Sequence, residues 1–263
     1  LTYAPQNEHA SNLGAVIANA IATELAIPAY IYDAVTVDEL EPLAKVTGLP
    51  EMQRKGMGHN LNMRAAAMKY AKENNKPYRD ISVIVAHLGG GITLSLHHKG
   101  QIVDMISDDE GPFSPERAGG LPAFQVIDMA TREGMGKKAM MKKVKTQGGL
   151  MGYFGVNDTR IVEKMMMDGD EKAKLIYDAM ILNVARNIAK LAVYVDGKVD
   201  NIILTGGIAY SEYFTKEVAK RVEFIAPVIV YAGENEMESL ALGALRVQRG
   251  EEEAKTFTKV VPQ

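Results

Sequence analysis

Apolar side chains in the first eighty residues follow a helical period in several stretches. From Leu13 to Leu25 they recur every three or four positions, which is the spacing of one helix face. The helices predicted in this part of the chain cover residues 12–26, 38–47 and 61–72. Between the first two, the β-branched and aromatic run at 29–33 predicts a strand that ends at Asp33. His59 precedes or opens the third helix.

The hydrophobic period shortens to that of β-strands after residue 80. The predicted strands cover residues 81–86, 92–96 and 101–106. A run of three glycines at 89–91 separates the first two, and His98-Lys99-Gly100 makes the second turn. Three strands joined by such short connections predict an antiparallel meander.

Helices dominate from residue 121, and the chain ends in alternating strands and helices. The predicted helices are 122–134, 137–145, 159–167, 170–196, 211–222 and 236–249, with strands at 201–204 and 228–231. This order is typical of an α/β protein with mixed sheets. We expect two lobes, one over residues 1–120 that contains the meander, and a helical and β-α-β-α lobe over residues 121–263.

Composition narrows the possible functions. The chain has 263 residues, of which 47% are hydrophobic, enough to bury a substantial core, and its formal net charge is −3. That charge provides no general basic field, so neither nucleic acid nor a membrane surface is an expected partner, and any anion must be bound locally. The absence of cysteine excludes disulfides and thiolate chemistry and is compatible with the cytoplasm. No membrane span or signal peptide is predicted.

Glycine-rich turns next to strands suggest phosphate binding, but the two common phosphate-binding patterns are absent. The dinucleotide pattern GxGxxG fails because Leu94 and Ile208 stand where glycine is required. The P-loop pattern fails because Thr131 stands where its first glycine would be. What remains is the glycine run 89–91, whose backbone amides can approach a polyphosphate closely. A glycine-rich hairpin with a packed histidine is an equally good interpretation of this run alone.

Two further segments carry candidate chemistry. Gly206-Gly207 follows a predicted buried strand and precedes a helix, a place suited to a nucleoside or phosphate, although such a turn often serves packing alone. Residues 108–122 combine glycines, prolines and charged side chains, and Arg117 in this loop can bind a carboxylate or phosphate with both arms of its guanidinium. Without the other motifs, a solvated linker would be the preferred explanation of the loop.

Together these segments resemble the butyrate kinases, which belong to the acetokinase group of the actin-like, hexokinase and Hsp70 ATPase superfamily. The matching segments, in the family's order, are HASNLGA at 9–15, AHLGGGI at 86–92, EGPFSPERAGGLP at 110–122, ILTGGIA at 203–209 and GENE at 233–236. The resemblance implies a two-lobed, ribonuclease H-like ATPase fold, with each lobe built on a βββαβαβα core and the second lobe binding the nucleotide. It also implies reversible phosphoryl transfer between ATP and a short carboxylate, which yields an acyl phosphate and ADP and requires Mg²⁺. A cytoplasmic homo-oligomer is expected from the same resemblance.

The resemblance also assigns roles to individual residues. His59 corresponds to the histidine that bonds the phosphoryl group in flight, and Arg117 to the arginine that orients the substrate and stabilises the transferring charge. Asp33, also expected to be catalytic, and Glu236 fall where the acidic residues associated with Mg²⁺ lie; a strand-end cap and a helix first-turn charge are their alternative interpretations. His9 corresponds to a histidine near the carboxylate substrate. The nucleotide- and phosphate-binding set comprises His87, Gly89, Gly90, Gly91, Asp158, Arg160, Gly206, Gly207 and Ile208.

Two departures from the family pattern affect this interpretation. Gly58 precedes His59 where a larger apolar side chain is expected at the acyl pocket, so that pocket is either widened or repacked. The family's N-terminal region, with its first phosphate-binding loop, is not found, so the first lobe is expected to lack its N-terminal strands. The alternatives to a carboxylate kinase are a shortened, catalytically silent nucleotide-binding module of the same fold, and an interaction protein with coincidental motifs.

Overall fold

The computed structural model describes residues 13–35, 37–132 and 135–256. The chain divides into two compact units, one made of residues 1–34 and 235–263, and the other of residues 35–234. The lobe boundary expected near residue 120 stays a prediction, although the sheet of the larger unit takes strands from both sides of it.

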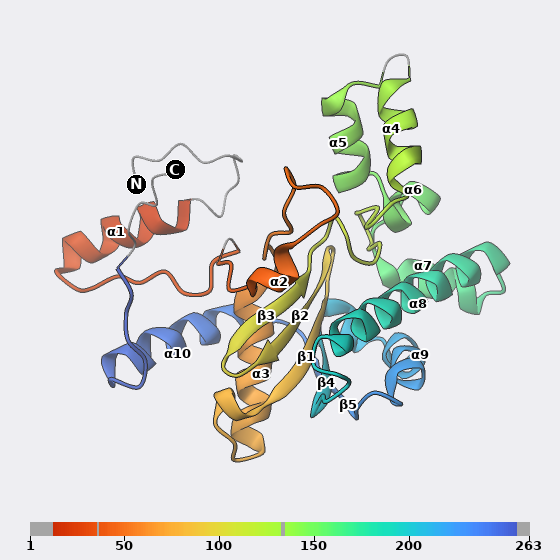
Figure 1. The fold of residues 1–263 in the computed structure, drawn as a ribbon. Helices are drawn as coiled ribbons and strands as arrows, with labels where there is room; N and C mark the ends of the chain where they lie inside the picture. Colours follow the sequence, from red (N-terminus) through yellow and green to blue (C-terminus); the bar gives the residue numbers. More distant parts are fainter. Residues whose placement is uncertain (1–12, 36, 133–134, 257–263) are drawn as a thin grey trace. The chain divides into compact units, whose positions relative to one another are not determined.

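The larger unit is built around a five-stranded mixed sheet (Figure 1). Its strands are β1 Ser82–Leu88, β2 Ile92–His98, β3 Gln101–Ile106, β4 Asn201–Gly206 and β5 Val228–Ala232, in the order β3-β2-β1-β4-β5. The first three strands pair antiparallel, which confirms the predicted meander, whereas β4 pairs parallel with β1 and β5 pairs parallel with β4. The predicted α/β class with a mixed sheet is therefore confirmed.

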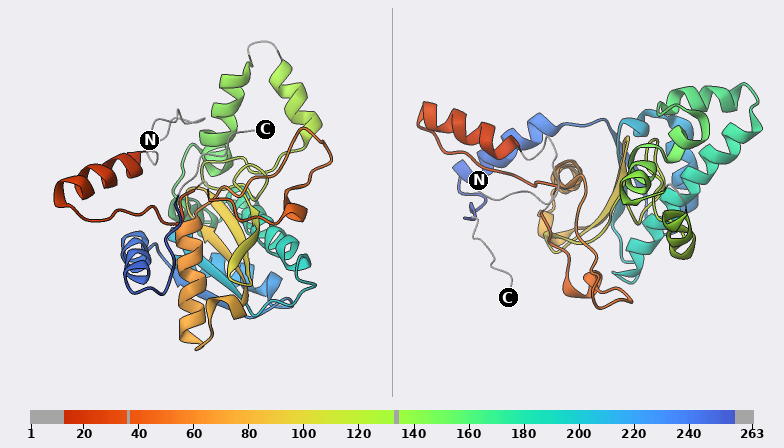
Figure 2. Two further views of the ribbon diagram at one scale, coloured as in Figure 1. Left: turned by 60° about the vertical axis from the view of Figure 1, so that its left-hand side comes forward. Right: turned by 90° about the horizontal axis from the view of Figure 1, so that it is seen from above.

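Helices cover both faces of this sheet. α3, Asn60–Glu73, packs on one face, and α8, Glu171–Val193, packs on the other together with α9, Glu212–Val222 (Figure 2). α7, Thr159–Met167, packs against α8. Because both faces are covered, the central strands β1 and β4 are buried over nearly their whole length and show no in–out alternation. Three antiparallel strands followed by helix, strand, helix and strand match the first seven elements of the βββαβαβα core that the family resemblance implies for each lobe.

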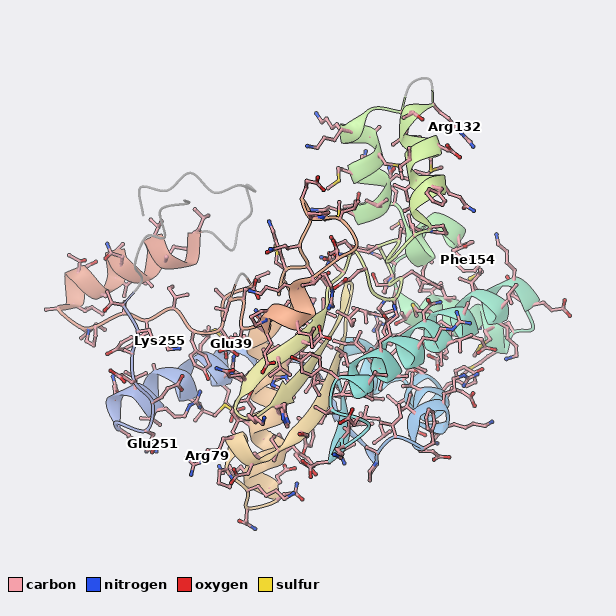
Figure 3. The ribbon with its side chains drawn as sticks, in the orientation of Figure 1. Glu39, Arg79, Arg132, Phe154, Glu251 and Lys255 are labelled. Atoms are coloured by element: carbon pink, nitrogen blue, oxygen red, sulfur yellow. The ribbon has the colours of Figure 1, made fainter. Side chains whose placement is uncertain are left out.

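The remaining helices are shorter than α3 and α8. They are α1 Gly14–Leu25, α2 Pro42–Lys45, α4 Ala123–Thr131, α5 Lys137–Thr146, α6 Gly149–Phe154 and α10 Glu236–Gln248, with 3-10 turns at Tyr78–Asp80 and Gly207–Tyr210. α4 and α5 stand side by side away from the sheet, with the exposed Arg132 at the end of α4 (Figure 3). Of the helices in the described residues, none has the length and apolarity needed to cross a membrane.

Most predicted elements are confirmed to within a few residues, but two predictions are wrong. Residues 29–32 form no strand, because a strand needs a neighbour for its backbone hydrogen bonds and no described segment pairs with them. The helix predicted over 38–47 is limited to α2. Pro42 lacks an amide proton and the preceding Glu41 is extended, so the helix begins at the proline. The short helix α6 lies outside the predicted set.

Gly206 ends β4 in a conformation that other residues rarely adopt. Its φ is +92°, and a β-carbon placed there would lie 2.5 Å from the carbonyl oxygen of Leu88. We expect Gly206→Ala to lower the free energy of unfolding by about 1–3 kcal/mol through backbone strain alone, with the steric clash adding to that loss. Urea denaturation measures the effect, and Gly207→Ala is the control because a β-carbon at Gly207 meets open space. Equal stability of the two variants would contradict this prediction.

Candidate active site

Two glycine turns meet at one edge of the sheet. β1 and β4 run parallel, and His87 lies beside Thr205 in their register, so both strands end at the same edge. The glycine run 89–91 follows β1, and the turn at Gly206-Gly207 ends β4. In open α/β sheets the carboxyl ends of the strands are where ligands bind. The two turns predicted as phosphate and nucleoside sites therefore lie together.

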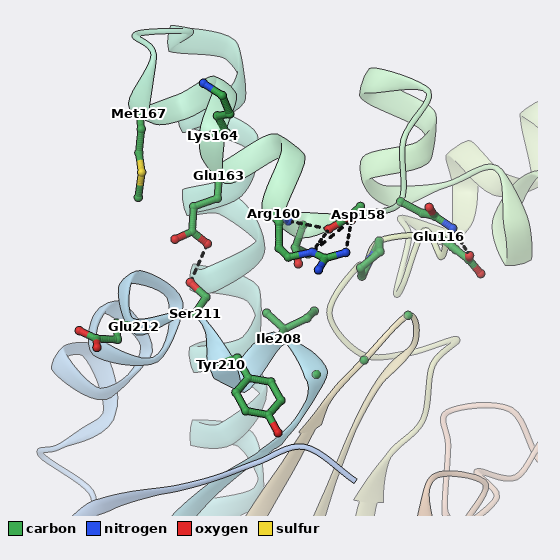
Figure 4. A pocket seen from close by; sticks show the side chains of 16 residues that line it. Glu116, Asp158, Arg160, Glu163, Lys164, Met167, Ile208, Tyr210, Ser211 and Glu212 are labelled. Atoms are coloured by element: carbon green, nitrogen blue, oxygen red, sulfur yellow. Dashed lines mark hydrogen bonds and ion pairs between the residues drawn. The ribbon is translucent and has the colours of Figure 1, made fainter.

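A cavity of about 890 Å³ opens beside these turns (Figure 4). Six members of the predicted nucleotide-binding set line it, namely Gly89, Gly90, Asp158, Arg160, Gly207 and Ile208. Tyr210, Ser211 and Glu163 also line the cavity and were not predicted. A volume of this size is typical of small-molecule and cofactor sites.

One wall of the cavity is the first turn of α7. Asp158 caps this helix, since its Oδ1 accepts the backbone N–H of Arg160 at 2.9 Å. The Arg160 guanidinium returns to the same carboxylate, with Nε 3.0 Å from Oδ1 and Nη2 2.7 Å from Oδ2. The hydrogen bonds from Arg160 lower the pKa of Asp158. Asp158 and Arg160 thus act as one charged, hydrogen-bonded group in the cavity wall.

Glu163 ties this wall to the core of the larger unit. Its Oε2 accepts hydrogen bonds from the Tyr177 hydroxyl at 2.9 Å and from the Ser211 hydroxyl at 2.7 Å. Ser211 also caps α9 by accepting the backbone N–H of Phe214 at 3.1 Å. Burial raises the pKa of Tyr177 far above its usual value, so its hydroxyl stays a donor. One carboxylate therefore joins α7, α8 and α9.

Two histidines stack beside the glycine run. His59 stands at the N-cap of α3 and His87 near the end of β1, with ring centroids 4.0 Å apart and ring planes inclined by 19°. His87 is buried, with Nδ1 3.4 Å from the amide nitrogen of Asn62 and Nε2 3.3 Å from a carboxylate oxygen of Glu234. The Nδ1 atom of His59 lies 2.9 Å from the Thr93 hydroxyl. The structure thus brings together two predicted site residues that are distant in sequence.

The ionisation states around this pair follow from burial and neighbouring charges. Burial, together with the nearby His87 and Arg117, lowers the pKa of His59 from 6.5 to about 3. His59 is therefore neutral at physiological pH, and its ring is a hydrogen-bonding group and not a cation. The hydrogen bond from His87 lowers the pKa of Glu234, which keeps that carboxylate ionised.

Arg117 is held against the glycine run by its own loop. Its backbone N–H donates to the Ser114 hydroxyl at 3.2 Å, and that hydroxyl donates to the carbonyl oxygen of Gly90 at 2.7 Å. The guanidinium pairs with Asp108 and lies on Gly91, where an added β-carbon would be 2.6 Å from Nη1. The predicted substrate-binding arginine therefore lies next to the predicted phosphate-binding turn.

Arg54 anchors the loop that carries Arg117 and was not predicted. Its Nε and Nη2 contact the two carboxylate oxygens of Glu110 at 2.9 and 3.0 Å, and its Nη1 contacts Asp104 at 2.9 Å. Glu110 is 56 positions away in the chain. No local sequence pattern reveals a pair of this kind, and the same holds for the contact between His59 and Thr93.

Gly58 leaves no room for the side chain expected before His59. A β-carbon at Gly58 would lie 2.9 Å from the sulfur of Met105 and 3.2 Å from the Thr93 hydroxyl oxygen. Met105 and Thr93 therefore occupy the space that a larger side chain would need. Of the two interpretations of this glycine, the structure favours local repacking over a widened pocket.

The predicted metal-binding carboxylates belong to the smaller unit. Asp33 is half-buried with a φ of +44°, and Glu236 is the exposed first residue of α10. Within the described ranges, no three or more His, Cys, Asp or Glu side chains gather as a metal site. Magnesium commonly binds one or two carboxylates together with phosphate oxygens and water, so the donor chemistry of Asp33 and Glu236 fits this ion. Their metal role stays a prediction, and His9 lies outside the described residues.

Comparison with known proteins connects these features to one family. Residues 50–233 match the model of the Acetokinase family. Over 254 residues, 96% of this chain, the sequence is 46% identical to butyrate kinase 2 and 44% identical to butyrate kinase 1 of Clostridium acetobutylicum, covering 71% and 72% of those proteins. The chain belongs to the acetokinase family.

Solved structures of carboxylate kinases share the fold of this acetokinase-family chain. The acetate kinase of Porphyromonas gingivalis superposes with a TM-score of 0.74 at 18% identity, over 82% of this chain and 62% of that one. The acetate kinase of Entamoeba histolytica superposes with a TM-score of 0.73 at 18% identity, over 85% and 68% of the two chains. The chain thus spans less than two thirds of the P. gingivalis enzyme. The expected actin-like ATPase fold is confirmed.

His59 makes the stability of this acetokinase-family chain depend on pH. In the folded protein its pKa is about 3, against 6.5 for an unperturbed histidine, so between these values only the unfolded chain takes up the proton. We therefore expect the free energy of unfolding to fall as the pH is lowered from 6.5 towards 3. For this group the slope is up to about 1.4 kcal/mol per pH unit. Urea denaturation across this range measures it.

The matched comparison for this prediction is His59→Asn. The substitution removes one titrating group and keeps the buried His97, whose pKa burial also lowers. The free energy of unfolding of the variant should depend less steeply on pH than that of the wild type. Equal slopes for the two proteins would show that His59 is not buried as a neutral imidazole.

Proposed function

We propose that this chain is a short-chain carboxylate kinase that transfers a phosphoryl group reversibly between ATP and butyrate or a related short acid. The observation that carries the proposal is the meeting of the His59–His87 pair, Arg117 and the glycine run 89–91 at the end of β1. Relatives at 44% and 46% identity are butyrate kinases, which supports butyrate as the acceptor over other short acids.

The transfer requires positioning more than acid–base chemistry. A carboxylate oxygen attacks the γ-phosphorus of ATP and forms a new P–O bond, while the bond to the β,γ-bridging oxygen breaks and its electron pair leaves with ADP. The attacking carboxylate is already ionised at neutral pH and needs no general base. A neutral His59 can donate a hydrogen bond to the transferring group, and Arg117 can neutralise its charge.

The cavity beside the two glycine turns supports the adenosine site of this reaction. Ile208 offers an apolar surface to the base. The paired Asp158 and Arg160 offer polar groups of opposite charge. Backbone amides of Gly90 and Gly91 can approach phosphate oxygens because no β-carbon covers them, whereas the Gly89 amide donates to the Gly91 carbonyl oxygen at 3.2 Å. His87 stacks on His59 and keeps that ring next to the phosphate-binding turn.

Kinases of the acetokinase family use ATP with a divalent metal ion. Here Mg²⁺ is the proposed ion, and Asp33 and Glu236 are the residues that would hold it. When bound, the ion would neutralise negative charge on the β- and γ-phosphates. A role of His9 at the carboxylate site, a homo-oligomeric state and a cytoplasmic location are further proposals from the family resemblance.

The test is acyl phosphate formation from Mg-ATP with acetate, propionate, butyrate and isobutyrate. We expect turnover with butyrate or isobutyrate to exceed that with acetate. Arg117→Ala should lower kcat by about 100-fold or more, because a fixed donor at the developing charge contributes several kcal/mol. The melting temperature of Arg117→Ala should stay close to that of the wild type, since Arg117 lies in a loop. The exposed Arg79, substituted in the same way, is the control.

Two outcomes separate the alternatives, and a third tests the role of Arg117. A rise in melting temperature with Mg-ATP but no transfer to any acid would identify a silent nucleotide-binding module. Neither stabilisation nor transfer would leave an interaction protein as the better description. Normal turnover by Arg117→Ala would remove Arg117 from the reaction while leaving the kinase activity intact.

Gly91→Ala asks whether the position of Arg117 matters as well as its charge. The added β-carbon would displace the guanidinium, and the end of an arginine side chain can move without disturbing the core. We expect kcat to fall about 10- to 100-fold, while the free energy of unfolding changes by less than about 1 kcal/mol. Gly48→Ala is the control because a β-carbon there meets open space. Full activity of Gly91→Ala would mean that the place of Arg117 on Gly91 is not needed.

A further inference from the structure

Thr93 lies on β2 with its hydroxyl against the ring of His59. We propose that Thr93 is a positioning residue that holds His59 as the neutral tautomer with its proton on Nε2. A threonine hydroxyl has one proton to donate and two lone pairs with which to accept. Its other partners therefore decide which atom receives the proton.

Among the residues that the structure describes, the Thr93 hydroxyl has three polar neighbours. The backbone N–H of His59 donates to it at 3.3 Å, Nδ1 of His59 lies 2.9 Å away, and the sulfur of Met63 lies 3.8 Å away. If Nδ1 carried a proton, the hydroxyl could donate only to the distant sulfur, which is a weak acceptor. A hydrogen bond from the hydroxyl to Nδ1 at 2.9 Å is much stronger than one to the sulfur at 3.8 Å.

The Met63 sulfur already accepts a hydrogen bond from a separate series of hydrogen-bonded side chains. Arg64 has only donors, and its Nη1 donates to the Tyr78 hydroxyl at 3.1 Å. The Tyr78 hydroxyl also lies 2.7 Å from Nδ1 of His97 and can donate its own proton there. His97 is fully buried and neutral, so its Nε2–H donates to Ser95 at 2.8 Å, and Ser95 donates to the sulfur at 3.2 Å. Because the Ser95 proton goes to the sulfur, the Ser95 oxygen accepts from Nε2–H of His97, and Nδ1 of His97 is left to accept from Tyr78.

Because this series of hydrogen bonds already provides a donor to the Met63 sulfur, the Thr93 proton is available for His59. Thr93 and Ser95 are on the same face of β2, and both approach Met63 of α3, but only Ser95 does so at a short distance. Thr93 then donates to Nδ1 of His59, and the single proton of the neutral ring has to sit on Nε2. Burial disfavours the doubly protonated ring, in keeping with the lowered pKa of His59.

The tautomer decides what His59 can offer to a ligand. With the proton on Nε2, that nitrogen is an N–H donor, which suits an anion with oxygen acceptors. With the proton on Nδ1, the ring would present a lone pair and repel those oxygens. The kinetic consequence rests on the proposed carboxylate kinase function, whereas the tautomer itself does not.

Nitrogen-15 NMR of the full chain measures the tautomer directly. Long-range proton–nitrogen correlations distinguish a protonated ring nitrogen from an unprotonated one, and the His59 signals are those lost in His59→Asn. We expect Nδ1 to be unprotonated and Nε2 protonated at neutral pH with no ligand present. A protonated Nδ1 in the wild type would overturn the proposal, whatever the activity of the chain.

Two variants at position 93 link the tautomer to function. Thr93→Val removes the hydroxyl and keeps the shape, so we expect a mixture of His59 tautomers and a kcat lowered by about 10- to 100-fold, with the KM for ATP changed less than about twofold. Thr93→Ser keeps the hydroxyl and should restore both the tautomer and kcat. The control is Thr215→Val, which removes a hydroxyl that bonds the backbone of α9 and should change neither.

The outcomes distinguish a positioning role from a structural one. An unchanged tautomer in Thr93→Val would overturn the proposal even if kcat fell, because the loss would then come from packing. If Thr93→Val does not fold, the spectra of the wild type and of Thr93→Ser decide the question. A wild type that turns over no acid would contradict the proposed function, while the His59 spectrum would still test the role of Thr93.

Discussion

The parallel pairing of β1 with β4 is the constraint on which the candidate site depends. Parallel strands end at the same edge of a sheet, so the pairing places the glycine run 89–91 next to Gly206-Gly207, although α4 to α8 separate them in the chain. Gly206 takes a positive φ where the Leu88 backbone comes too close for any β-carbon. The two turns are therefore packed against each other, and the cavity opens beside both.

The two faces of the sheet differ in the kinds of side chain that they bury. The face towards α8 and α9 is apolar and forms the larger core cluster, to which β2 contributes Leu94 and Leu96. The face towards α3 takes the alternate residues of β2, and these are Thr93, Ser95 and His97, all buried and hydrogen-bonded. Burying such groups is costly unless every one finds a partner. The face towards α8 and α9 thus carries the larger apolar cluster, and the face towards α3 combines a smaller one with the hydrogen bonds that order the histidines of the site.

The site holds its charges through local pairing. The chain carries a formal net charge of −3, so an anion gains nothing from a general field. His59 is kept neutral by burial and by its cationic neighbour Arg117, whose own charge is paired with Asp108. In the proposed function, an incoming phosphate would replace Asp108 as the partner of the guanidinium and would meet backbone amides and a neutral imidazole. This arrangement limits the cost of holding positive charge at the site before a ligand arrives.

Sequence by itself determined the elements of the core, because the periods of helices and strands and the residues that begin and end them act over a few positions. It also marked Arg117 and the glycine turns through short motifs, and the resemblance to a known family added His59, Asp158 and Arg160. Only the tertiary structure decided that β4 pairs parallel with β1, that His59 stacks on His87, and that Thr93 contacts His59 and Arg54 contacts the loop of Arg117. These contacts join segments far apart in the chain and leave no local pattern. For the same reason the run at 29–33 had every local property of a strand and yet formed none, since a strand exists only where another segment pairs with it.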